Sequence, residues 1–257
     1  MLLGIDVGNT NITVGIFDGG KLLGTFRLTT KQTCTSDEYG MYIKTLMRER
    51  FDSPIEIDGC IISSVVPNLM HSLTSAIIKY FDIRPIIVGP GLKTGIRINI
   101  DNPKEVGADK IVDAVAAHEI YGGNCIVIDF GTATTFDLLA ADGTYHSGVI
   151  APGIQISARA LSEKAAKLPE IELRMPKTII SKNTVEAMQA GVLYGYIGAC
   201  RHIIGKLKEE SGMKNVLVIA TGGLGKIIAD ELPEIDIYDN ALILKGLAIL
   251  YEKNRGN

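Results

Sequence analysis

Two short stretches of the sequence have the residue types needed to hold a phosphate group and its metal ion. The first is Asp6-Val7-Gly8-Asn9-Thr10-Asn11, and the second is Asp129-Phe130-Gly131-Thr132. In each, Asp ends an apolar run, Gly allows a tight turn, and Asn or Thr adds hydrogen-bonding groups. Such groups suit a nucleotide phosphate and its magnesium, which Asp6 would contact directly or through water. One isolated copy would be explained equally well as an ordinary β-turn.

The two stretches repeat each other, which favours the phosphate interpretation. Asp129 follows Asp6 by 123 residues, and Gly131 follows Gly8 by the same number. A third junction of small residues, Thr221-Gly222-Gly223, follows another apolar run in the second half. Three such junctions at matched positions are hard to explain as ordinary β-turns alone. We therefore predict two phosphate-binding turns that face each other, with a polyphosphate between them.

The region from residue 89 to residue 110 offers the residues for a substrate site. Its sequence, GPGLKTGIRINIDNPKEVGADK, begins with a Gly/Pro turn and leads into a predicted helix. Gly107 and Ala108 leave room for a ligand at the start of that helix, where backbone N–H groups favour an anion. Asp109 is available to accept a proton from a substrate hydroxyl. The alternative is that Asp109 only complements the helix dipole.

Apolar patterns divide the chain into two halves with the same order of elements: a three-strand meander, then helix, strand, helix and strand. Capping-box spacing at Thr35/Glu38 and at Asn183/Glu186 marks two helix starts. We expect strands at 2–8, 11–18, 21–28, 57–66, 85–89, 124–131, 134–140, 144–150, 215–223 and 235–239. We expect helices from Thr35 to Arg50 and at 68–81, 107–121, 184–210, 224–232 and 241–251. This alternation predicts an α/β protein of two similar mixed-sheet domains, 1–116 and 117–257, with a cleft between them.

The composition excludes several classes of protein. The formal net charge is −3, so nothing in the electrostatics favours a nucleic-acid partner. The opening MLLGID has no basic region before its apolar residues, and no apolar run is long enough to span a membrane. The four cysteines lie far apart without metal-ligand spacing, which fits reduced, buried thiols. We expect a cytoplasmic protein without a nucleic-acid or membrane partner.

The duplicated halves, the two phosphate turns and the Gly-Gly junction resemble the superfamily of actin, hexokinase and the chaperone ATPases, which has a ribonuclease H-like fold. That resemblance implies ATP use. The motifs IDVGNTN, GPGxKTG, NPxEVGAD, IDFGTATTFD and GVIAPG, in this order along the chain, closely resemble the type III pantothenate kinases. This resemblance implies ATP-dependent phosphorylation of pantothenate to 4'-phosphopantothenate, the first step of coenzyme A biosynthesis.

The family resemblance also implies roles for individual residues. Asp109 is the implied general base, and Asp129 binds a monovalent cation, K⁺ or NH₄⁺. The residues implied to contact ATP, with its Mg²⁺, are Asp6, Val7, Gly8, Asn9, Thr10, Asn11, Ile12, Thr13 and Thr132. The residues implied to contact pantothenate are Gly107, Ala108, Asp109, Lys110 and Thr184. Family members are homodimers, and the long helix after Thr184 is the expected interface.

Two positions depart from the family pattern. The family usually has Arg where this chain has Lys110, and a guanidinium can hold a carboxylate through two parallel bonds, whereas an ammonium cannot. Many relatives carry an aromatic residue where this chain has Ile100. Both changes point to weaker pantothenate binding. The alternatives are therefore a catalytically impaired relative that acts as a nucleotide-binding regulatory protein, or a kinase for another small hydroxylated acid.

Overall fold

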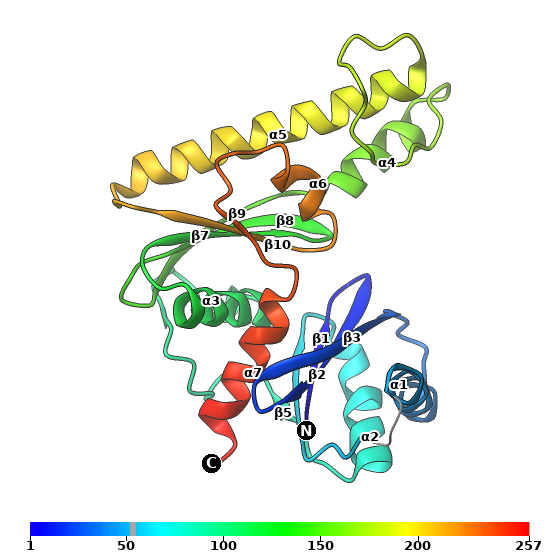
Figure 1. The fold of residues 1–257 in the computed structure, drawn as a ribbon, viewed down its shortest axis with the longest axis vertical. Coiled ribbons are helices and arrows are strands. Elements are labelled where there is room, and N and C mark those ends of the chain that lie inside the picture. Colours follow the sequence, from blue (N-terminus) through cyan, green and yellow to red (C-terminus); the bar gives the residue numbers. More distant parts are fainter. Residues whose placement is uncertain (52–54, 257) are drawn as a thin grey trace. The chain divides into compact units, whose positions relative to one another are not determined.

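The computed structural model describes residues 1–51 and 55–256, which form two compact units (Figure 1). Unit 1 contains Met1–Ile96, Asp101–Glu119 and Ala241–Asn257. Unit 2 contains Arg97–Ile100 and Ile120–Asn240. The sequence-based boundary at residue 116 placed the last helix in the second half, whereas the structure groups this helix with unit 1.

Unit 1 is built on a five-stranded mixed sheet in the order β3-β2-β1-β4-β5. Its strands are β1 (Leu2–Val7), β2 (Asn11–Asp18), β3 (Lys21–Thr29), β4 (Gly59–Ser64) and β5 (Ile86–Ile87). The first three strands form the expected antiparallel meander, and β4 runs parallel to β1. Because β1 lies in the middle of the sheet, its carboxyl end places Asp6 between two neighbouring strands.

Helices cover both faces of the unit 1 sheet. On one face, apolar side chains of β1 and β2 pack against α1 (Ser36–Arg50) and α2 (Met70–Phe81), which follows the short helix η1 (Pro67–Leu69). The capping box of Thr35 and Glu38 is present at the start of α1. On the other face lies α7 (Leu242–Asn254): Cβ atoms at Gly4 and Gly15 would contact its Leu247 and Leu244. This packing explains why the last helix belongs with unit 1.

Unit 2 repeats the topology of unit 1 and adds one strand. Its sheet has the order β11-β10-β7-β8-β9-β6, so the first five strands match β5-β4-β1-β2-β3 of unit 1. The strands are β6 (Arg97–Ile98), β7 (Cys125–Phe130), β8 (Ala133–Leu139), β9 (Thr144–Pro152), β10 (Leu217–Thr221) and β11 (Ile237–Tyr238). The duplication expected from the sequence is therefore confirmed in the strand order of the two sheets.

The helix α5 (Thr184–Ser211) runs along one face of the unit 2 sheet, with α4 (Ile154–Lys164) beside its N-terminal part (Figure 1). Apolar side chains of β7 and β8 pack there against α5 and α6 (Gly225–Ala229). The sequence did not predict α4, because it begins after Gly153, which has no side chain to mark the start of a helix.

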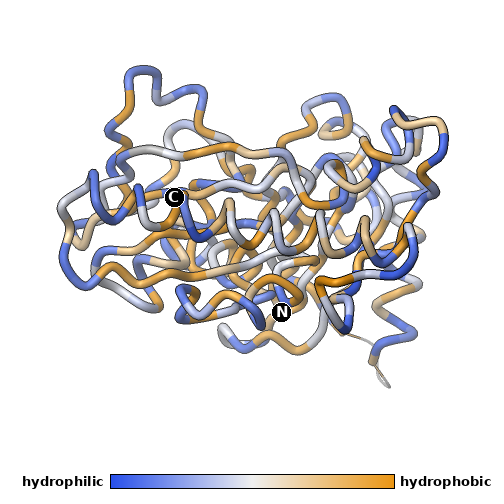
Figure 2. Tube along the Cα trace, turned by 90° about the horizontal axis from the view of Figure 1, so that it is seen from above, coloured by the Kyte–Doolittle hydropathy of each residue, from blue (hydrophilic) through white to orange (hydrophobic). Residues whose placement is uncertain are grey.

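Hydrophobic and hydrophilic segments alternate along the chain (Figure 2), and the buried hydrophobic side chains come mainly from the strands and the packed helices. All four cysteines are free and buried, as expected. Within residues 1–51 and 55–256, no helix is long and apolar enough to cross a membrane.

Candidate active site

The first phosphate turn connects β1 to β2 in unit 1. The Gly8 N–H donates to the Asn11 carbonyl over 3.0 Å, which closes the turn around Asn9 and Thr10. Both of these residues are exposed, whereas the side chains of Val7 and Ile12 are fully buried in the core. Of these four residues, only Asn9 and Thr10 have side chains accessible to a nucleotide. Val7 and Ile12 can contribute only their backbone.

Asp6 lies between two hydroxyl-bearing residues of the neighbouring strands. The sheet register pairs it with Thr13 on β2 and with Ser63 on β4. Ser63 is fully buried, and within the described part of the chain its hydroxyl has no hydrogen-bond partner. Buried polar groups are normally hydrogen-bonded. The Ser63 hydroxyl is therefore a further candidate oxygen ligand next to Asp6, which the sequence patterns did not assign to the site.

The segment that carries Asp109 lies at the same edge of unit 1. A short helix, η2 (Pro103–Glu105), leads into α3 (Ala108–Ile120). A Cβ atom at Gly107 would be 3.6 Å from Val65 Cγ1, and the Val65 N–H donates to the carbonyl of Val7 over 3.1 Å. The structure therefore brings the Gly-Ala-Asp turn close to the end of β1, where the first phosphate turn begins.

The carboxylate of Asp109 folds back over Gly107. Its Oδ1 atom accepts the N–H of Lys110 at 2.8 Å, and a Cβ atom at Gly107 would lie only 2.3 Å from the same oxygen. The missing side chain of Gly107 therefore creates the space that this carboxylate occupies. Both Asp109 and Lys110 are partly exposed. The side chain of Asp109 can thus reach a bound hydroxyl while its orientation is held by the backbone.

The second phosphate turn, between β7 and β8 in unit 2, is enclosed by two glycines. A Cβ atom at Gly222 would lie 2.6 Å from the Phe130 carbonyl oxygen and 2.7 Å from Asp129 Oδ1. A Cβ atom at Gly153 would lie 2.2 Å from the carbonyl oxygen of Thr132. The predicted junction at residues 221–223 therefore lies against Asp129. Gly153, the last residue of GVIAPG, packs on the other end of the same turn.

Asp129 has the same surroundings in its sheet as Asp6. The register pairs it with Thr135 on β8 and with Thr221 on β10, which correspond to Thr13 and Ser63 in unit 1. Each Asp is thus flanked on both sides by a residue with a hydroxyl group. The Thr135 hydroxyl donates to Asp137 Oδ2 over 3.1 Å, so a second carboxylate lies on the same face of β8. Carboxylate and hydroxyl oxygens suit cations that prefer oxygen ligands.

Two tyrosines that the sequence did not assign to the site contact residues that flank the second turn. The hydroxyl of Tyr238 donates to the carbonyl of Gly222 over 2.8 Å. Tyr196, on α5, hydrogen-bonds the Thr134 hydroxyl and donates to the carbonyl of Pro152 over 3.2 Å. Burial raises the pKa of Tyr196 to about 12, so its hydroxyl keeps its proton at neutral pH. Only the folded chain brings these side chains to the turn.

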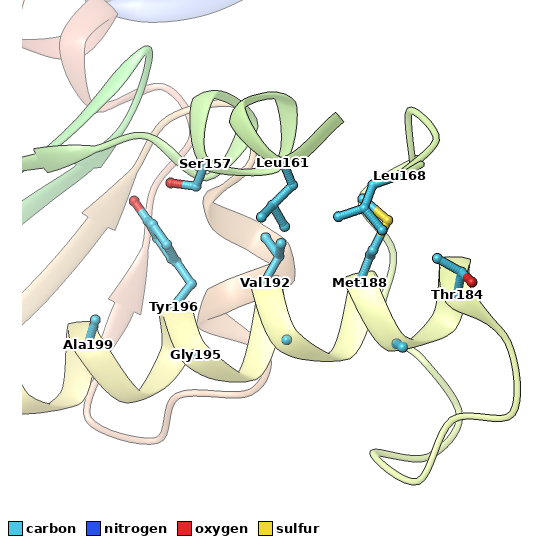
Figure 3. Close-up of a pocket in the computed structure, with 11 residues that line it drawn as sticks. Ser157, Leu161, Leu168, Thr184, Met188, Val192, Gly195, Tyr196 and Ala199 are labelled. Atoms are coloured by element: carbon cyan, nitrogen blue, oxygen red, sulfur yellow. The ribbon is translucent and has the colours of Figure 1, made fainter. Parts of the chain in front are cut away.

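Thr184 lies apart from the second phosphate turn. It is the first residue of α5 and is exposed at one end of a pocket of about 560 Å³, and Tyr196 lies further along the same helix (Figure 3). The twelve residues of helix between them correspond to about 18 Å. The pocket is lined mainly by apolar side chains of α4 and α5, including Leu161, Met188 and Val192. The structure therefore does not bring Thr184 together with Asp129 within unit 2.

Comparisons with known proteins agree with these features. The family model "Type III pantothenate kinase" matches residues 2–206. A type III pantothenate kinase from Agathobacter rectalis is 56% identical over 253 residues, which are 98% of this chain and 97% of that protein.

Solved structures share the fold at much lower identity. A Campylobacter jejuni protein assigned to the Baf family of transcriptional activators has a TM-score of 0.61 at 20% identity, covering 99% of this chain and 100% of that one. The activator of 2-hydroxyisocaproyl-CoA dehydratase from Clostridium difficile, with bound ADPNP, has a TM-score of 0.55 at 13% identity, covering 99% and 96%. These likenesses concern the fold, which is of the actin/hexokinase type. Because the family model and the Agathobacter protein match most of its length, the chain belongs to the type III pantothenate kinase family.

Proposed function

We propose that the protein transfers the γ-phosphoryl group of ATP to the terminal hydroxyl of pantothenate and forms 4'-phosphopantothenate, in the first step of coenzyme A biosynthesis. The observation that carries this proposal is the 56% identity to a type III pantothenate kinase along nearly the whole chain. The duplicated Asp-Gly turns support it, because a carboxylate and hydroxyl groups beside a tight turn suit a nucleotide phosphate and its magnesium.

In this proposal, Asp109 is the general base. Phosphoryl transfer asks little covalent chemistry of a protein, so positioning of the hydroxyl and stabilisation of charge carry most of the catalysis. The Asp109 carboxylate, oriented by the Lys110 N–H, accepts the proton of the attacking hydroxyl. Pantothenate is bound by Gly107, Ala108 and the Lys110 ammonium. Thr184 contacts the same substrate.

The first turn binds the phosphates of ATP. It does so with Asp6, Asn9, Thr10, Asn11 and Thr13 and with the backbone of Val7, Gly8 and Ile12. Thr132 contacts ATP from the second turn. The residues around Asp6 fit Mg²⁺, because this ion takes oxygen ligands from one or two carboxylates together with substrate phosphates. The unpartnered Ser63 hydroxyl adds an oxygen donor there within the described residues. A bound Mg²⁺ neutralises phosphate charge during the transfer.

We further propose that Asp129 holds a monovalent cation, K⁺ or NH₄⁺. Its support is the register that sets Thr135 and Thr221 on either side of this carboxylate. In this proposal, the Asp129 carboxylate and the two threonine hydroxyl oxygens are the ligands of the cation. The Thr135 hydroxyl donates its proton to Asp137 Oδ2 over 3.1 Å, which leaves its lone pairs for the cation.

A homodimer formed through α5 is part of the proposal. This helix exposes a stripe of small residues, Gly191, Gly195 and Gly198, where added Cβ atoms would meet nothing within 4 Å. The large apolar side chains of Ile179, Ile180 and Val185 are exposed close to its start. A second copy of the chain would cover these groups. We place the enzyme in the cytoplasm, which supplies ATP and keeps its four free thiols reduced.

The test is an assay of ADP release that requires pantothenate, run with Mg²⁺ and either K⁺ or Na⁺. We expect turnover that depends on pantothenate and is faster in K⁺. Asp109→Asn should abolish turnover while leaving the affinity for ATP, measured by isothermal titration, nearly unchanged. Asp18→Asn, at the exposed end of β2, is the matched control and should behave as wild type. Equal loss of ATP affinity in Asp109→Asn would contradict its role as a base.

A further inference from the structure

We propose that Thr30 is a positioning residue for the first phosphate turn, and that Gly153 is its counterpart in the duplicated half. Neither residue belongs to the sets that the sequence assigned to ATP or pantothenate. This inference rests on the proposed function, according to which both turns bind ATP.

Thr30 follows the last residue of β3 and contacts the first turn through two hydrogen bonds. Its hydroxyl donates to the carbonyl of Gly8 over 2.7 Å, and its backbone N–H donates to the carbonyl of Thr10 over 2.9 Å. Twenty-two residues separate Thr30 from Gly8 along the chain. The hydroxyl bond is thus a tertiary contact that no local pattern requires.

The bond from the Thr30 hydroxyl determines how the peptide between Gly8 and Asn9 is oriented. All described peptide bonds are trans, and in a planar trans peptide the C=O and the following N–H point in opposite directions. Because the Gly8 carbonyl points to Thr30, the N–H of Asn9 points away from it. Backbone N–H groups of such turns are donors to phosphate oxygens. Thr30 therefore orients a phosphate donor without touching the phosphate itself.

The same position in unit 2 supports the second turn by a different contact. The β2–β3 register pairs Asn11 with Thr29, and the β8–β9 register pairs Ala133 with Pro152. The residues that follow are Thr30 and Gly153, which are separated by 123 residues, as are Gly8 and Gly131.

Gly153 has no hydroxyl and approaches the second turn directly. A Cβ atom there would lie 2.2 Å from the Thr132 carbonyl oxygen and 2.8 Å from that of Gly131. One structural position, the residue after the third strand of each meander, thus supports the phosphate turn in both halves. Unit 1 uses a hydrogen bond for this purpose, and unit 2 uses close backbone contact.

The experiment compares Thr30→Val with Thr30→Ser and with a control, Thr25→Val, at an exposed position of β3. Valine has nearly the shape of threonine but lacks the donor. We expect Thr30→Val to raise the Kd for Mg-ATP about three- to tenfold, the effect of one net hydrogen bond. The KM for pantothenate should stay within about twofold of wild type, because the substitution should affect only the binding of ATP. Thr30→Ser and Thr25→Val should match wild type in both constants.

Isothermal titration with Mg-ATP and steady-state kinetics measure these constants, and thermal unfolding checks that each variant is folded. A purely structural role for Thr30 predicts a lower unfolding temperature with unchanged Kd and KM, and that result would overturn the inference. Valine has a second methyl group in place of the threonine hydroxyl. If this methyl group prevents folding, Thr30→Ala removes the hydroxyl without adding a methyl group and must show the same loss of ATP affinity. The proposed function fails separately, if the wild-type protein binds ATP but shows no turnover that depends on pantothenate.

Discussion

Replacing Gly107 with Ala should move the carboxylate of Asp109 without disturbing the rest of unit 1. The new Cβ atom would lie 2.3 Å from Asp109 Oδ1, whereas ordinary contacts begin at 3.4 Å. The oxygen must therefore move by about 1 Å to relieve the repulsion. The other close neighbour, Val65 Cγ1, would be 3.6 Å from the Cβ atom and can stay in place. The hydrogen bond from the Lys110 N–H to Asp109 Oδ1 would be weakened by the same movement.

A displacement of this size should have a large effect on catalysis and a small effect on stability. A misplacement of about 1 Å in a catalytic arrangement can cost about 100-fold in rate. We therefore expect Gly107→Ala to lower kcat about 100-fold. The affinity for ATP should stay within about twofold, because the first turn keeps its own hydrogen bonds. Thermal unfolding should be nearly unchanged, since the displaced group is the end of a side chain.

The assay is the release of ADP under saturating ATP and pantothenate, combined with titration of ATP into each variant. Gly256→Ala is the matched control, because this exposed glycine lies outside the helices and a Cβ atom there would meet nothing within 4 Å. A wild-type kcat in Gly107→Ala would show that catalysis does not require this orientation of Asp109. A higher KM for pantothenate with unchanged kcat would instead mean that Gly107 only leaves room for the substrate.

Two further predictions concern other parts of the chain. Gly153→Ala should lower kcat/KM for ATP about 100-fold, because the Thr132 carbonyl would have to move about 1 Å from a Cβ atom placed 2.2 Å away. Values equal to those of Gly256→Ala would show that this contact does not position the second turn. Burial raises the pKa of the thiols of Cys125 and Cys200 to about 12, so few thiolates exist at pH 8, and a thiol reagent should react slowly with the native protein. All four cysteines should react rapidly in denaturant, and fast labelling of these two in the native state would contradict their burial.

Much of the fold could be predicted because its signals are local. The offset of 123 residues between Asp6 and Asp129 revealed two similar halves, which the matching strand orders of the two sheets confirm. The side chains of Thr35 and Glu38 are three residues apart, so their spacing alone marked the start of α1. The helix α4 was missed because Gly153 offers no capping side chain, although the contact of Gly153 with the second turn requires that glycine.

The final helix shows why the boundary between the units was harder to predict. Its amphipathic pattern predicted a helix but carries no information about which sheet it covers. Gly4 and Gly15 leave space on the unit 1 sheet for Leu247 and Leu244, and a glycine in a strand is compatible with many other neighbours. The assignment of α7 to unit 1 depends on shape complementarity between segments more than 200 residues apart.

The two Asp-Gly turns and the Gly-Ala-Asp turn could be recognised in the sequence alone, because each is a run of neighbouring residues, and together they indicated the family. Which residues surround these turns is visible only in the folded chain. Thr30 contacts Gly8 across 22 residues, and Tyr196 contacts Thr134 across 62. Such contacts depend on the register of strands and the packing of helices, which follow from burying apolar surface over the whole unit. A residue's type shows which hydrogen bonds it can make, and the fold determines its partner.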